Sequence, residues 1–158
     1  MGFLHSVMCK DRIYDIRYKI YDIRELISRN GAERKNMIKT FQDLDVWQQG
    51  HKFVLKIYTL TKKFPTAERF GLVSQLQRAA VSITCNIAEG FSRYYFKDRV
   101  RFYYQARGSL SEAQNLVLIA QDVNYISAKT AQELLVESHR VNNILNGLIK
   151  KTCEINKK

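Results

Sequence analysis

The sequence has a single proline, Pro65, and only seven glycines among its 158 residues. Proline and glycine are the residues that most often interrupt regular structure. No stretch sustains the alternation of apolar and polar residues, with a period of two, that is typical of half-buried strands. These scarcities argue against a turn-rich β architecture and predict an all-α protein.

Cysteine is also scarce. The sequence has three cysteines, Cys9, Cys85 and Cys153, which is an odd number; they are far apart and lack the spacing of zinc ligands. We therefore predict neither a disulfide framework nor a metal site, and this usage fits a reducing compartment. No apolar run approaches the ~18 residues of a membrane-spanning helix, and MGFLHSVMCKD at the start reaches charge too soon for a secretory signal. We expect a cytoplasmic protein with no membrane partner and no cofactor.

Acidic residues are outnumbered, because 26 Lys and Arg against 15 Asp and Glu give a net charge of +11. Residues 1–36 hold eight basic and five acidic residues, which leaves 18 basic and 10 acidic residues, or +8, in the rest. The charge therefore belongs to the main body of the chain. Such a surface favours a polyanion or an acidic protein, although excess lysine also simply keeps a domain soluble.

The sequence shows no spacing of residues that is typical of a catalytic nucleophile and its base. His5, His51 and His139 have no cysteine, serine or carboxylate at a spacing that suggests a nucleophile with its base. The sequence predicts a protein that is not an enzyme.

An amphipathic helix is predicted near the start, at about residues 11–29. It carries an a/d stripe of isoleucines, namely Ile13, Ile16, Ile20, Ile23 and Ile27. Asn30 and Gly31 end it, and residues 30–36 have the polar composition of a linker. We expect an N-terminal extension over residues 1–36 and a separate domain over residues 37–158.

Four further stretches of helical periodicity predict an up-down antiparallel four-helix bundle over residues 37–158. The expected helices run from Asp43 or Asp45 to Phe64, from about Leu72 to Gly90, from about Ser92 to Val123, and from a cap at Ser127 onward.

The third of these helices is predicted to carry a nucleic-acid-binding face. At 100° per residue, one exposed stripe is formed by Arg93, Lys97, Arg101, Tyr104 and Arg107. Lysine and arginine neutralise phosphates, and Tyr104 is available to stack on a base. The alternative is a solvated face on a basic protein.

Two other residues of this helix require an explanation. Arg99 falls on the apolar side, where burial requires a carboxylate partner. Gly108 costs about 1 kcal/mol relative to alanine inside a helix, so we expect another backbone to approach it closely.

Two signatures, SQLQRAAVSITCNIAEG at 74–90 and RFYYQARGSLSEA at 101–113, resemble the four-helix bundle family encoded by intervening sequences of 23S ribosomal RNA, the S23 family. Residues 41–72 fit the same pattern, and the resemblance covers about Met37 to Leu148. It implies a homopentamer with no catalytic residues. It also implies a relation to accessory proteins of diversity-generating retroelements, which engage nucleic acid and a reverse transcriptase.

The family's polar signature implies a structural network between helices. The predicted members are Gln75, Arg78, Asn86, Glu89, Ser109 and Glu112, with Ser82 and Arg107 at further signature positions. RNA binding by these positions is the alternative. Trp47 and Tyr58 are candidates for burial between subunits.

The expected function is that of a non-enzymatic, oligomeric protein that binds nucleic acid, with ribosomal RNA as the ligand. One alternative is a scaffold that docks an acidic protein or a reverse transcriptase. A product of the intervening sequence with no host role is another.

Overall fold

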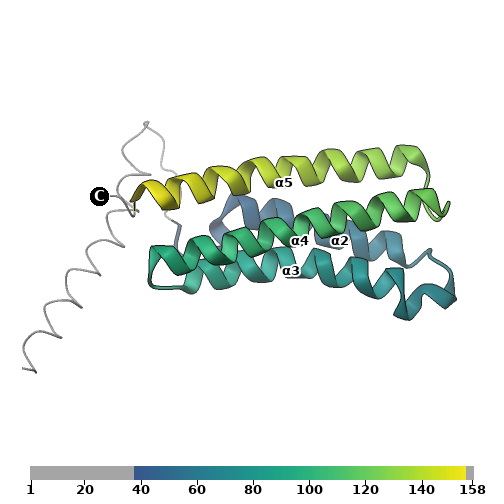
Figure 1. Ribbon diagram of the computed structural model, residues 1–158, viewed down its shortest axis with the longest axis horizontal. Helices are drawn as coiled ribbons and strands as arrows, with labels where there is room; N and C mark the ends of the chain where they lie inside the picture. Colours follow the sequence, from purple (N-terminus) through teal and green to yellow (C-terminus); the bar gives the residue numbers. More distant parts are fainter. Residues whose placement is uncertain (1–37, 156–158) are drawn as a thin grey trace, which may run out of the picture. The chain divides into compact units, whose positions relative to one another are not determined.

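The computed structural model describes residues 38–155, and in this range the chain is helical with no strand. Four α-helices lie side by side, alternating in direction, as a bundle (Figure 1). They are α2 (Asp45–Thr61), α3 (Leu72–Ser92), α4 (Phe96–Asp122) and α5 (Ala128–Ile155), and two short 3-10 helices are η1 (Phe41–Asp43) and η2 (Thr66–Phe70). The predicted all-α bundle is confirmed. The expected helix at 11–29 lies outside the described residues, and the boundary after residue 36 stays a prediction.

The first helix begins at Asp45, one of the two residues expected at its start, and ends three residues before the predicted Phe64. Asp43 belongs to η1, where its carboxylate accepts a hydrogen bond from the Thr40 N–H (2.8 Å), and α2 begins at Asp45. At the other end, Lys63 N–H donates to Leu60 O (3.0 Å), an i→i+3 bond that tightens the last turn and closes the helix at Thr61. Pro65 has no N–H with which to continue the helix.

The connection between α4 and α5 follows local sequence signals. Asn124 has a φ of 60°, in the left-handed region, and the Tyr125 N–H donates to Ala120 O (2.9 Å). This is the hydrogen-bond pattern of a Schellman motif, in which asparagine is tolerated. Ser127 Oγ accepts from the Thr130 N–H (3.2 Å), so the predicted cap of α5 is confirmed.

The third predicted helix begins later than expected. Ser92 is the last residue of α3, and α4 starts at Phe96. Between them lies the α3–α4 turn, residues 93–95, in which Arg93 (ψ 141°) and Tyr95 (ψ 135°) have extended backbones.

The core is aliphatic and lies between the four helices. Its largest fully buried apolar side chains are Phe53, Ile57, Leu76, Ile83, Ile87, Leu110, Leu145, Val46, Val117 and Val141. Each contributes about 1.5–3 kcal/mol relative to an exposed position. Small residues such as Ala80, Ala106 and Ala113 are also fully buried and allow the helices to approach closely.

The tightest approach is between α3 and α4. A Cβ at Gly90 would lie 2.6 Å from Cε1 of Tyr103, a residue that is itself buried. Gly108 behaves differently from our expectation, since nothing lies within 4 Å of the position that its Cβ would take. The close approach predicted for Gly108 is therefore absent within the described chain, because Gly108 faces outward.

We predict opposite effects of alanine at these two glycines. Gly90→Ala is expected to lower the free energy of unfolding by about 1–3 kcal/mol, because the buried Tyr103 ring has no space into which to move. Gly108→Ala meets no neighbour and is expected to raise it by up to about 1 kcal/mol through helix propensity. Urea unfolding followed by circular dichroism checks both. Equal stability of Gly90→Ala and the wild type would contradict this account of the packing.

Candidate nucleic-acid interface

Three of the five residues predicted for the basic stripe are cations of α4, and with Tyr104 they share its exposed side. Lys97, Arg101, Tyr104 and Arg107 are all exposed, at spacings of four, three and three residues. We call these four residues the α4 basic face. At 1.5 Å per residue it is about 15 Å long.

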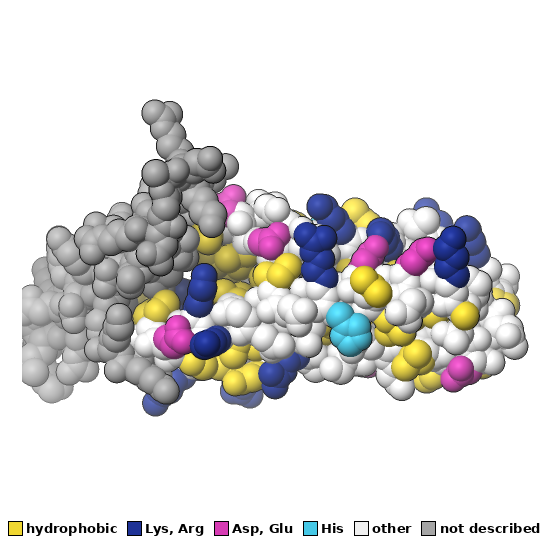
Figure 2. Space-filling model, turned by 90° about the horizontal axis from the view of Figure 1, so that it is seen from above, with side chains coloured by type: hydrophobic (Ala, Val, Ile, Leu, Met, Phe, Trp, Pro, Cys, Tyr) yellow, Lys and Arg dark blue, Asp and Glu magenta, His cyan; other side chains and the backbone are white. Residues whose placement is uncertain are grey.

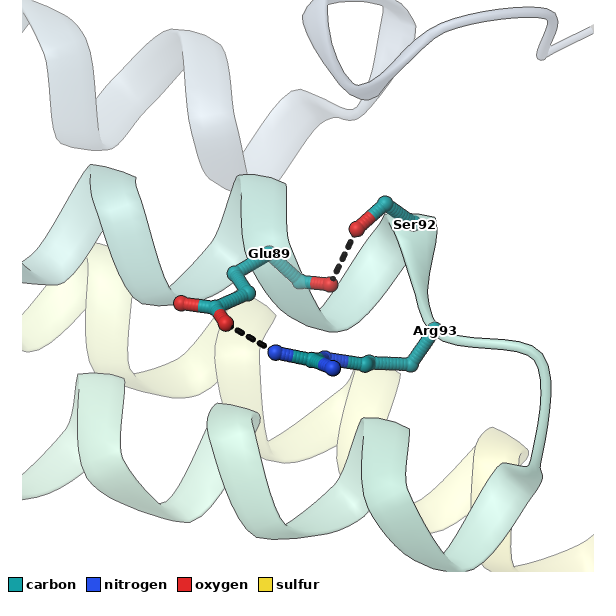
Figure 3. Close-up of polar contacts among 3 residues, drawn as sticks. All are labelled: Glu89, Ser92 and Arg93. Atoms are coloured by element: carbon teal, nitrogen blue, oxygen red, sulfur yellow. Dashed lines mark hydrogen bonds and ion pairs between the residues drawn. The ribbon is translucent and has the colours of Figure 1, made fainter.

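Arg93 does not share this face, because the helix is interrupted at residues 93–95. Its guanidinium forms an ion pair with Glu89, one turn earlier on α3, where Ser92 Oγ also donates to Glu89 O (2.8 Å; Figure 3). The same guanidinium lies over the Phe102 ring, 4.6 Å from its centroid. Arg93 therefore closes the end of α3 rather than extending the α4 basic face.

Tyr104 is half-exposed and is paired with an arginine. The guanidinium of Arg107 lies 4.8 Å from the centroid of its ring, and Arg107 Nη1 also donates to Asn146 Oδ1 on α5 (3.3 Å). One face of the Tyr104 ring is thus covered by a cation, and only the rest of the ring remains for a base.

Arg99 is half-buried, and its partner is a main-chain oxygen and not a carboxylate. Its Nε–H donates to Arg93 O (2.6 Å), and its guanidinium lies 5.4 Å from the centroid of Phe96. Burial lowers the pKa of Arg99. The carbonyls at the C-terminal end of α3 are the negative end of the helix dipole, which explains how a cation is held there without an acidic side chain.

The segment around this site carries an excess of positive charge, as do residues 46–67, which hold four lysines and no carboxylate. Residues 90–111 contain five cationic side chains, Arg93, Lys97, Arg99, Arg101 and Arg107, and one carboxylate, Asp98. α5 runs antiparallel to α4, so its C-terminal part lies beside this segment (Figure 1). The α5 side of the molecule is different, since Lys and Arg are intermixed there with Asp, Glu and apolar side chains (Figure 2).

The predicted polar network is smaller than expected within one chain. Ser82 Oγ and Ser109 Oγ are 2.9 Å apart across α3 and α4, and Asn86 Nδ2 donates to Ser82 Oγ (3.0 Å). Glu89 is paired with Arg93 instead. The remaining three predicted members, Gln75, Arg78 and Glu112, are exposed and make no side-chain hydrogen bond or ion pair within residues 38–155.

A groove between α2, η2 and α3 was not predicted. Its lining includes Tyr58, Arg69, Phe70, Val73, Arg78 and Val81. Phe70 is 89% exposed, and the guanidinium of Arg69 lies 5.6 Å from its ring centroid. The only sequence signal was a phenylalanine outside the apolar stripes. Trp47 lies apart, stacked on His51 with ring centroids 4.9 Å apart.

Within the described range, no three His, Cys, Asp or Glu side chains are grouped so that they could hold a metal ion. None of the helices described has the length and apolar character needed to cross a membrane.

Comparisons with known proteins identify a family and a similar fold. A family model described as 23S rRNA-intervening sequence protein matches residues 42–147. A crystal structure of a protein with unknown function from the S23 ribosomal protein family of Bacteroides thetaiotaomicron superposes with a TM-score of 0.63 at 22% identity, covering 66% of this chain and 95% of that chain. At this identity the likeness shows the fold alone. No curated protein matches the chain.

Burial raises the pKa of Tyr103 to about 12, and the opposing effect of the Arg99 charge is smaller. Because the folded state holds this proton more tightly than the unfolded chain, the stability present below pH ~10 is expected to fall as the pH rises toward ~12. Tyr103→Phe lacks this proton, so it should gain stability relative to the wild type over that window. Urea unfolding at a series of pH values checks this, and a pH-independent difference between the two proteins would contradict it.

Proposed function

The chain belongs to the family of 23S rRNA-intervening sequence proteins, and on that premise we propose that it is a non-enzymatic protein that binds RNA through the α4 basic face. The observation that carries this proposal is the exposure of Lys97, Arg101 and Arg107 on one side of a single helix. Cationic side chains aligned in this way neutralise successive phosphates. The cytoplasmic location expected from the sequence is compatible with such a ligand.

The length of the α4 basic face limits how much RNA it contacts. Its ~15 Å corresponds to about four nucleotide steps of ~3.4 Å along one strand. Three cations then account for about three phosphate contacts. Binding is therefore expected to be electrostatic and weakly sequence-specific, and the logarithm of the binding constant falls by about 0.7–0.9 per log unit of salt for each phosphate neutralised.

Ribosomal RNA is the ligand that we propose, because the family takes its name from the 23S gene. Fluorescence anisotropy with a labelled 23S ribosomal RNA fragment, against an unrelated RNA of equal length and at two salt concentrations, tests this. Tighter binding of the ribosomal fragment at both salts supports a specific ligand. Equal binding of both RNAs indicates that the protein attracts RNA only through its basic surface, without specificity.

We predict that reversing the three charges abolishes most of the binding. Lys97→Glu, Arg101→Glu and Arg107→Glu together are expected to weaken RNA binding at least tenfold and to reduce the salt slope by about 2, since about three phosphate contacts are lost. The matched control reverses Lys52 on α2 together with Lys62 and Lys63 directly after it, which are also exposed and change the net charge equally. Circular dichroism verifies that both variants fold. If the α4 variant keeps full affinity for RNA, or if the control loses as much affinity, the α4 basic face is excluded as the RNA-binding site.

We also propose that the chain assembles with itself, as a pentamer, through the groove between α2, η2 and α3. Tyr58 and Phe70 leave aromatic surface exposed there, and burial of that surface is favourable. Trp47 contributes less, because it already packs on His51.

Sedimentation at micromolar concentration checks the assembly. Phe70→Ser is expected to shift the protein toward the monomer, whereas Val136→Ser, at a residue of α5 that is 57% exposed, is the matched control and should not. A wild-type protein that sediments as a monomer would contradict the proposed pentamer.

A protein scaffold is the second candidate function, because the groove combines Phe70 with Arg69 and Arg78, a surface suited to an acidic partner. A reverse transcriptase, suggested by the resemblance, is one such partner. Affinity capture after nuclease treatment distinguishes the two functions: recovery of one stoichiometric acidic protein favours the scaffold, and its loss with RNA removal favours RNA binding.

A further inference from the structure

The C-terminal half of α4 carries apolar side chains that the core of the bundle does not cover. Leu118, Ile119 and Val123 are 45%, 39% and 46% exposed, and all three fall within six residues of one helix. Glu112 and Asp122 are exposed on the side where Ile119 lies, and neither forms an ion pair or side-chain hydrogen bond within residues 38–155. We call these five residues the α4 distal patch. It combines exposed apolar surface with unpaired negative charge.

The groove between α2, η2 and α3 combines apolar surface with the opposite charge. Arg69 and Arg78 belong to its lining together with Phe70, and the lining contains no carboxylate. Glu68 is next in the sequence, but its carboxylate accepts from the Tyr125 hydroxyl (3.1 Å) and is engaged away from the groove. Because cations lose hydration when a partner covers them, a surface that buries Phe70 here is favoured if it also supplies carboxylates.

The two surfaces match in length. Along α3 the lining of the groove extends from Val73 to Ser82, which is about 14 Å at 1.5 Å per residue. The α4 distal patch extends from Glu112 to Val123, which is about 16 Å. The patch of a second copy is therefore long enough to fill the part of the groove that follows α3.

The groove and the α4 distal patch lie on different sides of the bundle. α2 and α4 each contact α3 and α5, so α2 and α4 occupy opposite corners (Figure 1). The groove lies next to α2, whereas the patch belongs to α4. A contact between the two surfaces therefore joins separate copies head to tail. Head-to-tail contacts between identical subunits generate a ring when the rotation between neighbours closes.

We propose that the groove of one copy binds the α4 distal patch of a second copy. In this contact the apolar side chains of the patch cover Phe70, and its two carboxylates lie opposite Arg69 and Arg78, so burial and charge favour the same pairing. A contact of groove with groove is disfavoured, because it brings the arginines of both copies together. The inference rests on the proposed self-assembly and names the surface that enters the groove.

Charge reversal tests the pairing by sedimentation velocity at micromolar concentration, with circular dichroism to verify folding. Glu112→Arg with Asp122→Arg is expected to weaken assembly about tenfold or more, because like charges then face each other. Arg69→Glu with Arg78→Glu should weaken it equally. A chain with all four substitutions has complementary charges again and should regain most of its assembly. The matched control, Glu133→Arg with Glu154→Arg at exposed residues of α5, changes the net charge as the patch variant does and should assemble like the wild type.

Mixing two defective variants tests the head-to-tail arrangement. Phe70→Ser blocks the groove, and Leu118→Ser with Ile119→Ser blocks the patch, so each variant alone is expected to sediment as a monomer. Their mixture retains one intact groove and one intact patch and should form a one-to-one dimer without rings. A mixture that stays monomeric contradicts the pairing of these two surfaces.

The outcomes separate this inference from the assembly proposal on which it rests. If the patch variants assemble like the wild type while Phe70→Ser does not, the α4 distal patch is excluded and the groove still mediates assembly. If the chain with all four substitutions stays monomeric, the charges do not face each other and the pairing is wrong. If Phe70→Ser assembles normally, the groove itself is excluded. A wild-type protein that sediments as a monomer overturns both proposals.

Discussion

The close approach of α3 and α4 at Gly90 is the constraint on which the rest of the structure depends. The buried ring of Tyr103 lies where any side chain at position 90 would have to lie, so the two helices are fixed at this separation. Burial of Tyr103 and Ala106 also fixes the rotation of α4 about its axis. At 100° per residue, Tyr104, Lys97 and Arg101 are then turned about 100–160° from Tyr103 and face solvent, whereas Arg107 lies at the edge between the two sides. The exposed cations of α4 are thus a consequence of how its other side packs.

Side-chain hydrogen bonds then set the register of the helices along one another. Each adjacent pair of helices has at least one such contact: Gln77 with Thr61, Ser82 with Ser109, Gln114 with Ser138, and Lys56 with Glu137. Among the described residues no buried side-chain nitrogen or oxygen lacks a partner. An apolar core of alanine and leucine tolerates sliding, whereas a polar pair that must be satisfied favours one register. The surfaces of neighbouring helices are therefore held in a defined relation.

The helices could be predicted from the sequence because the apolar periodicity is strong, but the interactions at their ends could not. Glycine often ends a helix, yet Gly90 lies inside α3. The absence of a side chain at this position leaves space for the ring of Tyr103. Nothing in residues 92–96 marks the break between α3 and α4, so the expected face wrongly extended back to Arg93. Arg99 donates a hydrogen bond to a main-chain carbonyl, and no pattern of residue types predicts such a partner. The groove at Phe70 depends on three separate segments coming together and has no local signature.

The two surfaces that support our proposed functions are made by different residues. The α4 basic face belongs to residues 97–107, whereas the groove is lined by α2, η2 and the first half of α3, and the two sets share no residue. Their chemistry also differs: cations with a tyrosine in one, and Phe70 with valines and two arginines in the other. Association of copies through the groove does not use the residues of the α4 basic face. An oligomer would then present several such faces to one RNA, and the weak electrostatic attraction of each would gain from the effective concentration of the others.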